Sequence, residues 1–176
     1  MYLIPVNIKL GDIIVRDISY EELPEIHSLL NESDETKLLL GKKESFQFEE
    51  VRERFLESLS SVLDFFLGIY FKGEIIGIIK GRFENKSSTE IWILTFLLGE
   101  SYRKKGIGSC TLDGVEKWFS EYYSIGKFCV LAYEDNNKAM KFWKKNNYRL
   151  LRKTNIKHPS EKGIVVILEK KGDSCG

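Results

Sequence analysis

Short runs of apolar residues recur along the chain and predict the strands of a sheet. The strongest run covers residues 91–98, where a nearly unbroken apolar stretch is long enough for one buried strand. The turn signal Lys72-Gly73-Glu74 indicates that the apolar runs on its two sides form a hairpin. The other predicted strands cover 13–15, 65–71, 75–83, 128–133, 148–151 and 164–168.

Apolar residues at helical spacing predict the helices. Ser19 and Glu22 are the ends of a capping box for a helix that runs to about Leu30. Pro24 lies just past the position where proline is best tolerated, which favours a later start for this helix. Further helices are predicted over 48–62, from 106 to about 123, and after Asn136, whereas the polar segment 31–44 gives no clear prediction.

The predicted elements follow the order β-α-α-β-β-β-α-β-α-β-β, in which strands dominate. This order predicts an α+β (or α/β) fold built around one mixed sheet. A length of 176 residues fits one domain with a sizeable core. We therefore expect 1–176 to form a single domain, with its core at about 13–170 and a flexible tail over 172–176.

Composition and charge argue against several classes of protein. The chain is 43% hydrophobic and 30% charged, as is usual for a soluble globular protein. The net charge of +1 gives no overall attraction to nucleic acid or to an anionic membrane surface. No apolar run approaches the ~20 residues needed to span a bilayer, and the first five residues lack the features of a signal peptide. We expect no nucleic-acid partner and no membrane partner.

The cysteines are few and scattered. Cys110, Cys129 and Cys175 form no Cys-x-x-Cys pair, and His27 and His158 are the only histidines that could join them. This pattern argues against a metal site and against a disulfide framework. It favours a reducing compartment, so we expect a cytoplasmic protein without a bound metal.

A glycine-containing stretch, Arg103-Lys104-Lys105-Gly106-Ile107-Gly108-Ser109, follows the strongest predicted strand and opens a helix. Gly106 and Gly108 allow the backbone to bend tightly and to approach a ligand closely. The first N–H groups of the helix carry partial positive charge and suit a pyrophosphate. A basic surface turn explains the same residues equally well. A Walker A loop is absent, and the dinucleotide fingerprint lacks its third glycine.

A second block of residues makes the prediction of a bound ligand at this loop more specific. Residues 136–148 read Asn-Asn-Lys-Ala-Met-Lys-Phe-Trp-Lys-Lys-Asn-Asn-Tyr. Together with the Arg-x-x-Gly-x-Gly stretch, this block resembles the GNAT superfamily of N-acetyltransferases over about 13–170. Trp143 stands where the family usually has Tyr, Asn147 where it has Gly, and Tyr148 where it has Phe.

The resemblance implies a GNAT fold in which the two central strands, 91–98 and 128–133, splay apart and hold acyl-CoA between them. It implies direct transfer of an acetyl group from acetyl-CoA to a primary amine of a small molecule or a peptide, by a monomer or a homodimer. The acceptor pocket would lie between the N-terminal helices and the loop near His158. The cofactor-binding residues implied are Leu98, Arg103, Lys104, Lys105, Gly106, Ile107, Gly108, Ser109 and Asn136.

The catalytic residues are less clearly indicated. Acetyl transfer needs a neutral amine, and Glu90 is a candidate general base, although a solvated charge at the end of a strand is the commoner role for such a residue. Glu100 and Glu134 are weaker candidates. The family's usual Tyr protonates the leaving thiolate, which the indole of Trp143 cannot do at neutral pH. Tyr133 is therefore the candidate acid.

Three further readings stay open. Tyr148 is another phenol that could replace the missing acid. Cys110 lies in the first turn of the predicted helix and is either a nucleophile or, more commonly, a small buried filler. Trp143 is either part of the core or a neighbour of the thioester sulfur. Because the usual acid is missing, an alternative function also stays open, in which the domain binds acyl-CoA as a sensor without catalysis.

Overall fold

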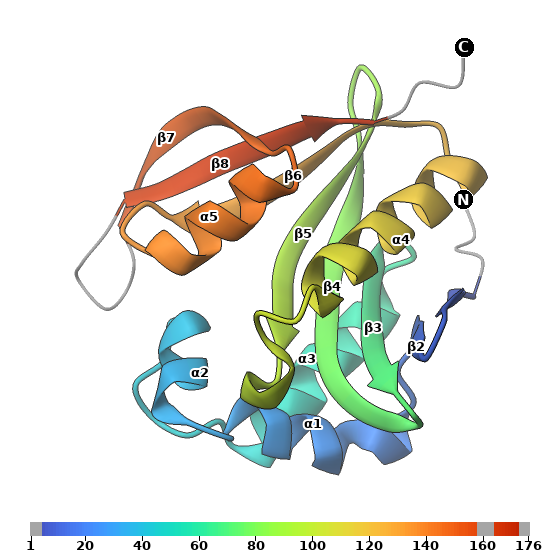
Figure 1. The fold of residues 1–176 in the computed structure, drawn as a ribbon, viewed down its shortest axis with the longest axis vertical. Helices are drawn as coiled ribbons and strands as arrows, with labels where there is room; N and C mark the ends of the chain where they lie inside the picture. The colour runs from blue at the N-terminus through green and yellow to red at the C-terminus, as the bar shows by residue number, and fades with distance from the viewer. Residues whose placement is uncertain (1–4, 158–163, 173–176) are drawn as a thin grey trace.

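The chain folds around an 8-stranded sheet with the order β1-β2-β3-β4-β5-β6-β8-β7 (Figure 1). The computed structural model describes residues 5–157 and 164–172. Neighbouring strands run antiparallel, except that β5 and β6 run parallel. The strands are β1 (Asn7–Leu10), β2 (Ile13–Asp17), β3 (Asp64–Phe71), β4 (Glu74–Asn85), β5 (Thr89–Leu98), β6 (Ile125–Tyr133), β7 (Arg149–Lys157) and β8 (Ile164–Lys171).

Helices cover both faces of this sheet. The helices are α1 (Leu23–Leu30), α2 (Asp34–Leu39), α3 (Phe48–Ser60), α4 (Ile107–Tyr122) and α5 (Asn137–Lys145), with short 3-10 turns η1 (Tyr20–Glu22) and η2 (Glu100–Tyr102). One hydrophobic cluster joins α1 and α3 to one face of the sheet through Phe66, Ile78 and Leu97. A larger cluster joins α4 and α5 to the other face. The core therefore has two layers, one on each side of the strands.

The strands and helices predicted from hydrophobic patterning are all present, with longer strands than expected. Helix α1 begins at Leu23, after a 3-10 turn, and carries Pro24 in its first turn, so the later start is confirmed. The hairpin between β3 and β4 turns at Lys72 and Gly73, which both have positive φ. Two elements were not predicted, β1 and α2, because short and mostly polar segments carry little periodic signal. Since β1 pairs with β2, the core begins before residue 13.

The two central strands pair along only part of their length. Parallel pairing of β5 with β6 runs from Thr89 to Ile93 on β5 and from Ile125 to Val130 on β6. Beyond that point β5 continues beside β4 alone and β6 beside β8 alone, so the predicted splay is confirmed. A bulge at Leu94 lies where the strands begin to separate, because Ile93 and Thr95 pair with consecutive residues of β4. Such a bulge bends the strand that carries it.

Some predictions fall outside the described residues. The loop near His158 and the end of the C-terminal tail lie there, as does the start of the chain. Within residues 5–157 and 164–172, no helix is long and apolar enough to cross a membrane. The same residues contain no group of three or more histidine, cysteine, aspartate or glutamate side chains that could hold a metal ion.

Candidate active site

The N-terminus of α4 lies in the glycine-containing loop, as the sequence predicts. Gly106 is the residue before the helix and has φ +80°, a left-handed conformation that glycine adopts without strain. The first helical hydrogen bond runs from the Cys110 N–H to the Gly106 carbonyl, at 3.0 Å. The N–H groups of Ile107, Gly108 and Ser109 come before it, and such groups have no acceptor within a helix. This end of α4 can therefore bind an anion.

The two glycines of the loop have different structural roles. A Cβ on Gly106 would meet nothing within 4 Å, so this residue is required for its backbone conformation and leaves room for a ligand. A Cβ on Gly108 would lie 3.1 Å from Cε2 of Phe142 and 3.4 Å from Cδ1 of Leu98. Gly108 thus lets α4 pack closely against α5 and the end of β5. The sequence suggested only an approach by a ligand.

The three cations of the loop differ in their surroundings. Arg103 donates from Nε to the Leu98 carbonyl at 2.7 Å and from its terminal nitrogen to Thr36 Oγ1 at 2.8 Å. Its guanidinium therefore joins β5 to α2, which differs from the expected place beside a phosphate. The carbonyl of Leu98 is likewise already an acceptor within the protein. Lys104 and Lys105 are exposed beside the helix terminus and are the cations that can reach an anion there.

Asn136 caps helix α5. Its side-chain oxygen accepts a hydrogen bond from the Ala139 N–H at 3.0 Å. Asn147, at the other end of this helix, has φ +69°. Asn tolerates the left-handed conformation better than most residues, which explains how it stands where the resemblance implies Gly.

Trp143 and Tyr148 belong to the core. Trp143 is 7% exposed, and its ring packs against the rings of Tyr148 at 4.9 Å and Phe96 at 6.0 Å. Tyr148 is 2% exposed and donates its hydroxyl to Glu116 at 2.6 Å. Burial and the neighbouring Glu116 carboxylate both raise the pKa of Tyr148. Tyr148 is therefore not placed to replace the missing acid.

Tyr133 is the last residue of β6, beyond the point where β5 and β6 separate. The preceding residue, Ala132, packs into the core beneath α4 and α5. Because side chains alternate along a strand, Tyr133 lies on the opposite face of the sheet. A phenol is protonated at neutral pH, as a general acid must be, and burial raises the pKa of Tyr133 further above its ordinary value.

Glu90 lies in the paired half of the central strands, at the far end of β5 from Leu98. Its side chain is 4% exposed, its Oε1 lies 3.1 Å from Lys127 Nζ, and its Oε2 accepts from Trp92 Nε1 at 3.2 Å. Burial acts to raise the pKa of this carboxyl, but Lys127 and Trp92 lower it overall. Glu90 is thus a buried, paired charge rather than a solvated one. Its position is remote from the splay, which argues against the predicted role as general base.

The weaker candidates are also engaged or exposed. Glu100 accepts a hydrogen bond from Ser33, and Glu134 forms an ion pair with Lys153 at 2.5 Å. Cys110 is exposed on the first turn of α4, so the expectation of a buried filler is wrong.

An acidic groove, which sequence reasoning missed, lies between α1 and the turn that joins β3 to β4. Its volume is about 550 Å³, and its walls include Glu22, Glu25, Glu32, Glu74 and Tyr70. The groove reaches the end of β5, because a Cβ on Gly99 would lie 3.3 Å from both Glu32 Oε2 and Leu29 Cδ1. Only Glu25 lies within α1, whereas Glu22 ends the preceding 3-10 turn and Glu32 follows the helix, so no single helical face in the sequence carries the signal of this groove.

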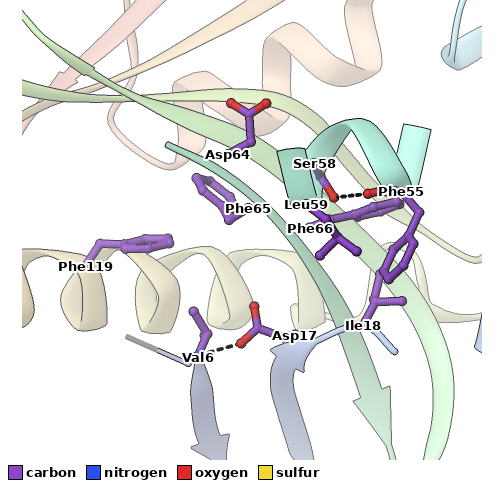
Figure 2. A pocket seen from close by; sticks show the side chains of 10 residues that line it. All are labelled: Val6, Asp17, Ile18, Phe55, Ser58, Leu59, Asp64, Phe65, Phe66 and Phe119. Atoms are coloured by element: carbon purple, nitrogen blue, oxygen red, sulfur yellow. Dashed lines mark hydrogen bonds between the residues drawn. The ribbon is translucent and has the colours of Figure 1, made fainter. Parts of the chain in front are cut away.

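A smaller cavity of about 150 Å³ lies between α3, α4 and the strands β2 and β3. Figure 2 shows phenylalanine rings along its walls, with Asp17 accepting from the Val6 N–H at 2.7 Å. None of the predicted site residues lines it.

The family follows from comparison of the whole chain with known proteins. The model of the acetyltransferase (GNAT) family matches residues 23–148. The chain belongs to the GNAT acetyltransferase family. This match contains both the glycine loop at the start of α4 and the block from Asn136 to Tyr148, so the resemblance seen in the sequence is confirmed.

Relatives within the family differ in what they act on. Spermine/spermidine N(1)-acetyltransferase of Bacillus subtilis is 23% identical over 88 residues, which span 47% of this chain and 58% of that enzyme. The acetyltransferase from Salmonella typhimurium that modifies the N-terminal serine of ribosomal protein L7/L12 has a TM-score of 0.84 at 16% identity, over 96% of this chain and 100% of that one. RimL, a ribosomal L7/L12 alpha-N-protein acetyltransferase solved with coenzyme A, has a TM-score of 0.82 at 16% identity, over 96% and 99%. The solved structures support the same fold.

Proposed function

We propose that this GNAT protein transfers the acetyl group of acetyl-CoA directly to a primary amine. The central support is the separation of β5 from β6 after Ile93 and Val130, next to the N-terminus of α4. The separated strands expose backbone groups that can pair with an extended ligand, and α4 offers N–H groups to a pyrophosphate. Lys104 and Lys105 add positive charge at that end. The residues present therefore fit acetyl-CoA.

The chemistry requires a neutral amine to attack the thioester carbonyl carbon. A C–N bond forms, the C–S bond breaks, the attacking amine releases a proton to water and the thiolate gains one, and the group that protonates the sulfur recovers its own proton from water. In this proposal Tyr133 supplies the proton to the sulfur, because it ends β6 beside the splay and its phenol is protonated at neutral pH. Trp143 packs in the core beneath α5 and takes no part in proton transfer.

The acceptor in this proposal is a polyamine or another amine with several positive charges. The observation that supports it is the acidic groove that ends at Gly99, where Glu32 lies beside the residue that follows β5. Several carboxylates along one groove attract a chain of ammonium groups and place its end at the splay. The Bacillus subtilis relative, an enzyme named for spermine and spermidine, has an acceptor of this class.

Release of the CoA thiol from acetyl-CoA over a panel of amines tests the proposal. Spermidine should give a higher kcat/KM than a monoamine with no second charged group, and a higher kcat/KM than a peptide with an N-terminal serine. The double variant Glu25→Gln with Glu74→Gln should raise KM for spermidine more than fivefold. The matched control Glu53→Gln with Glu121→Gln removes two exposed carboxylates elsewhere and should leave KM within twofold. Binding of acetyl-CoA without release on any amine would favour the sensor reading instead.

A further inference from the structure

Helix α2 is attached to both sides of the splayed strands. On one side Ser33 donates to Glu100, in the turn that follows β5. On the other side Glu35 forms an ion pair with Lys138 at the start of α5. Figure 1 shows α2 below α5 and beside the lower end of β5, so the helix spans the open end of the splay.

Arg103 is the most connected part of this attachment. It begins the loop that leads to α4, but its guanidinium turns to the Leu98 carbonyl and to Thr36, which is fully buried. The Thr36 hydroxyl in turn donates to Glu32 Oε1 at 3.1 Å, and a terminal nitrogen of Arg103 lies 3.5 Å from the same oxygen. The Glu100 N–H adds a third donor at 2.9 Å.

The two oxygens of the Glu32 carboxylate have different surroundings. Oε1 of Glu32 is held by Arg103, Thr36 and the backbone of Glu100. Oε2 faces Gly99 at the end of the acidic groove. A carboxylate that is fixed through one oxygen presents the other in a defined direction, which favours contact with a single ammonium group.

We propose that Arg103 is a positioning residue that acts through Glu32, holding this carboxylate toward the amine acceptor at the end of β5. The residue thereby links the acyl-CoA loop to the acceptor side of the site. This proposal rests on the proposed function, since it assigns a role to Arg103 in recognition of the cationic acceptor. It gives Arg103 a role different from that of its neighbours Lys104 and Lys105, which the proposed function assigns to binding of the cofactor.

The test is a double-mutant cycle on kinetics with spermidine and a binding measurement with acetyl-CoA. Arg103→Gln should raise the acceptor KM at least fivefold, while the acetyl-CoA Kd by calorimetry stays within twofold. Glu32→Gln should have a similar effect, and the double variant should be no worse than Glu32→Gln alone, because the two residues act in series. Arg149→Gln, which removes an exposed cation on β7, is the matched control and should change neither constant.

A second pair of variants guards against misfolding of the loop. Thr36→Val removes the hydroxyl that joins Arg103 to Glu32 and should reproduce the rise in acceptor KM, whereas Thr36→Ser keeps the hydroxyl and should restore the original value. Amide hydrogen exchange in residues 34–39 should speed up in Arg103→Gln and in Thr36→Val, with no acceptor present. This readout holds even if no amine is acetylated, so failure of the proposed function is distinguishable from failure of this inference.

Three results would overturn the inference. The first is a tenfold loss of acetyl-CoA affinity in Arg103→Gln with unchanged exchange in α2, which would make Arg103 a phosphate ligand. The second is additivity of Arg103→Gln and Glu32→Gln in the cycle. The third is an unchanged acceptor KM in Thr36→Val.

Discussion

The ring of Phe142 on α5 stacks on the ring of Phe96 on β5, with centroids 5.4 Å apart and planes inclined by 19°. Phe96 lies on the part of β5 that has already separated from β6, so this stacking joins the separated part of β5 to helix α5. The same Phe142 ring lies over Gly108 in the first turn of α4. Packing of aromatic rings and the position of the N-terminus of α4 are therefore coupled.

Substitutions at Gly108 should lower both stability and cofactor affinity. A Cβ there would come within 3.1 Å of Phe142, so Gly108→Ala requires a small shift and the larger Gly108→Val a greater one. We expect Gly108→Val to cost about 1–3 kcal/mol of unfolding free energy by chemical denaturation and at least tenfold in acetyl-CoA Kd. Adding Phe142→Leu should recover part of the stability. A Gly108→Val protein with unchanged stability and affinity would contradict both the packing and the site.

Replacing Lys104 and Lys105 by glutamine should separate their contacts with the cofactor. If one of them meets the ribose 3′-phosphate, the double variant binds CoA more weakly by a larger factor than it binds dephospho-CoA. The expected difference is at least threefold by calorimetry at low salt, and it should shrink as ionic strength rises. Equal losses for the two ligands would place both lysines at the pyrophosphate or in solvent.

Glu22 should contribute to stability in a defined range of pH. Burial acts to raise the pKa of its carboxyl, but hydrogen bonds from Arg16, the Ser19 N–H and Tyr70 outweigh burial and lower it from 4.5 to about 2. Because the folded-state pKa is depressed, the stabilisation is complete above about pH 4.5 and is lost as pH falls toward 2.

Glu22→Gln should therefore reduce the unfolding free energy by about 1–3 kcal/mol at neutral pH and flatten its decline below pH 5. Urea denaturation at several pH values measures both effects. Arg16→Gln removes the charged partner and should flatten the same decline, whereas Glu121→Gln, at an exposed carboxylate of α4, should not. An undiminished acid slope in Glu22→Gln would contradict the assignment.

Hydrophobic patterning was sufficient for most of the fold, because buried strands and amphipathic helices have the periodicity that burial demands. The apolar run of residues 91–98 predicts the strand β5 correctly, but it does not predict the bulge at Leu94. In an unbroken apolar run, apolar and polar residues do not alternate. The sequence therefore does not reveal the position at which a bulge makes the side chains change from one face of the sheet to the other. Helix α2 was missed because its residues, Asp34–Leu39, are held mainly by polar contacts that come from distant parts of the chain.

The site was predictable where a local motif imposes backbone geometry. Gly106 and Asn136 begin helices in ways that neighbouring residues alone specify. The partners of Arg103 and Glu90 could not be predicted, since Thr36 and Lys127 are brought to them only by the folded sheet and its connections. A charged residue in a motif therefore indicates a site, but long-range contacts decide which direction its side chain takes.

The indole of Trp143 packs between Tyr148 and Phe96, where the resemblance implies a catalytic Tyr. Its 7% exposure and its place in the larger core cluster support a structural role. Trp143→Tyr should therefore reduce the unfolding free energy by about 1–3 kcal/mol, because the smaller ring leaves part of the space unfilled. Turnover per folded molecule, measured with a good amine acceptor, should stay within twofold.

The pH profile of kcat distinguishes this structural role from a catalytic one. If Tyr133 donates the proton, Tyr133→Phe should lower kcat at least tenfold, while Trp143→Tyr should leave the shape of the profile between about pH 6 and 9 unchanged. A new or displaced limb in the profile of Trp143→Tyr, together with higher turnover, would show that a phenol at position 143 reaches the sulfur. That result would place the sulfur beside α5 rather than beside the end of β6, and an unchanged kcat in Tyr133→Phe would show that Tyr133 is not the proton donor.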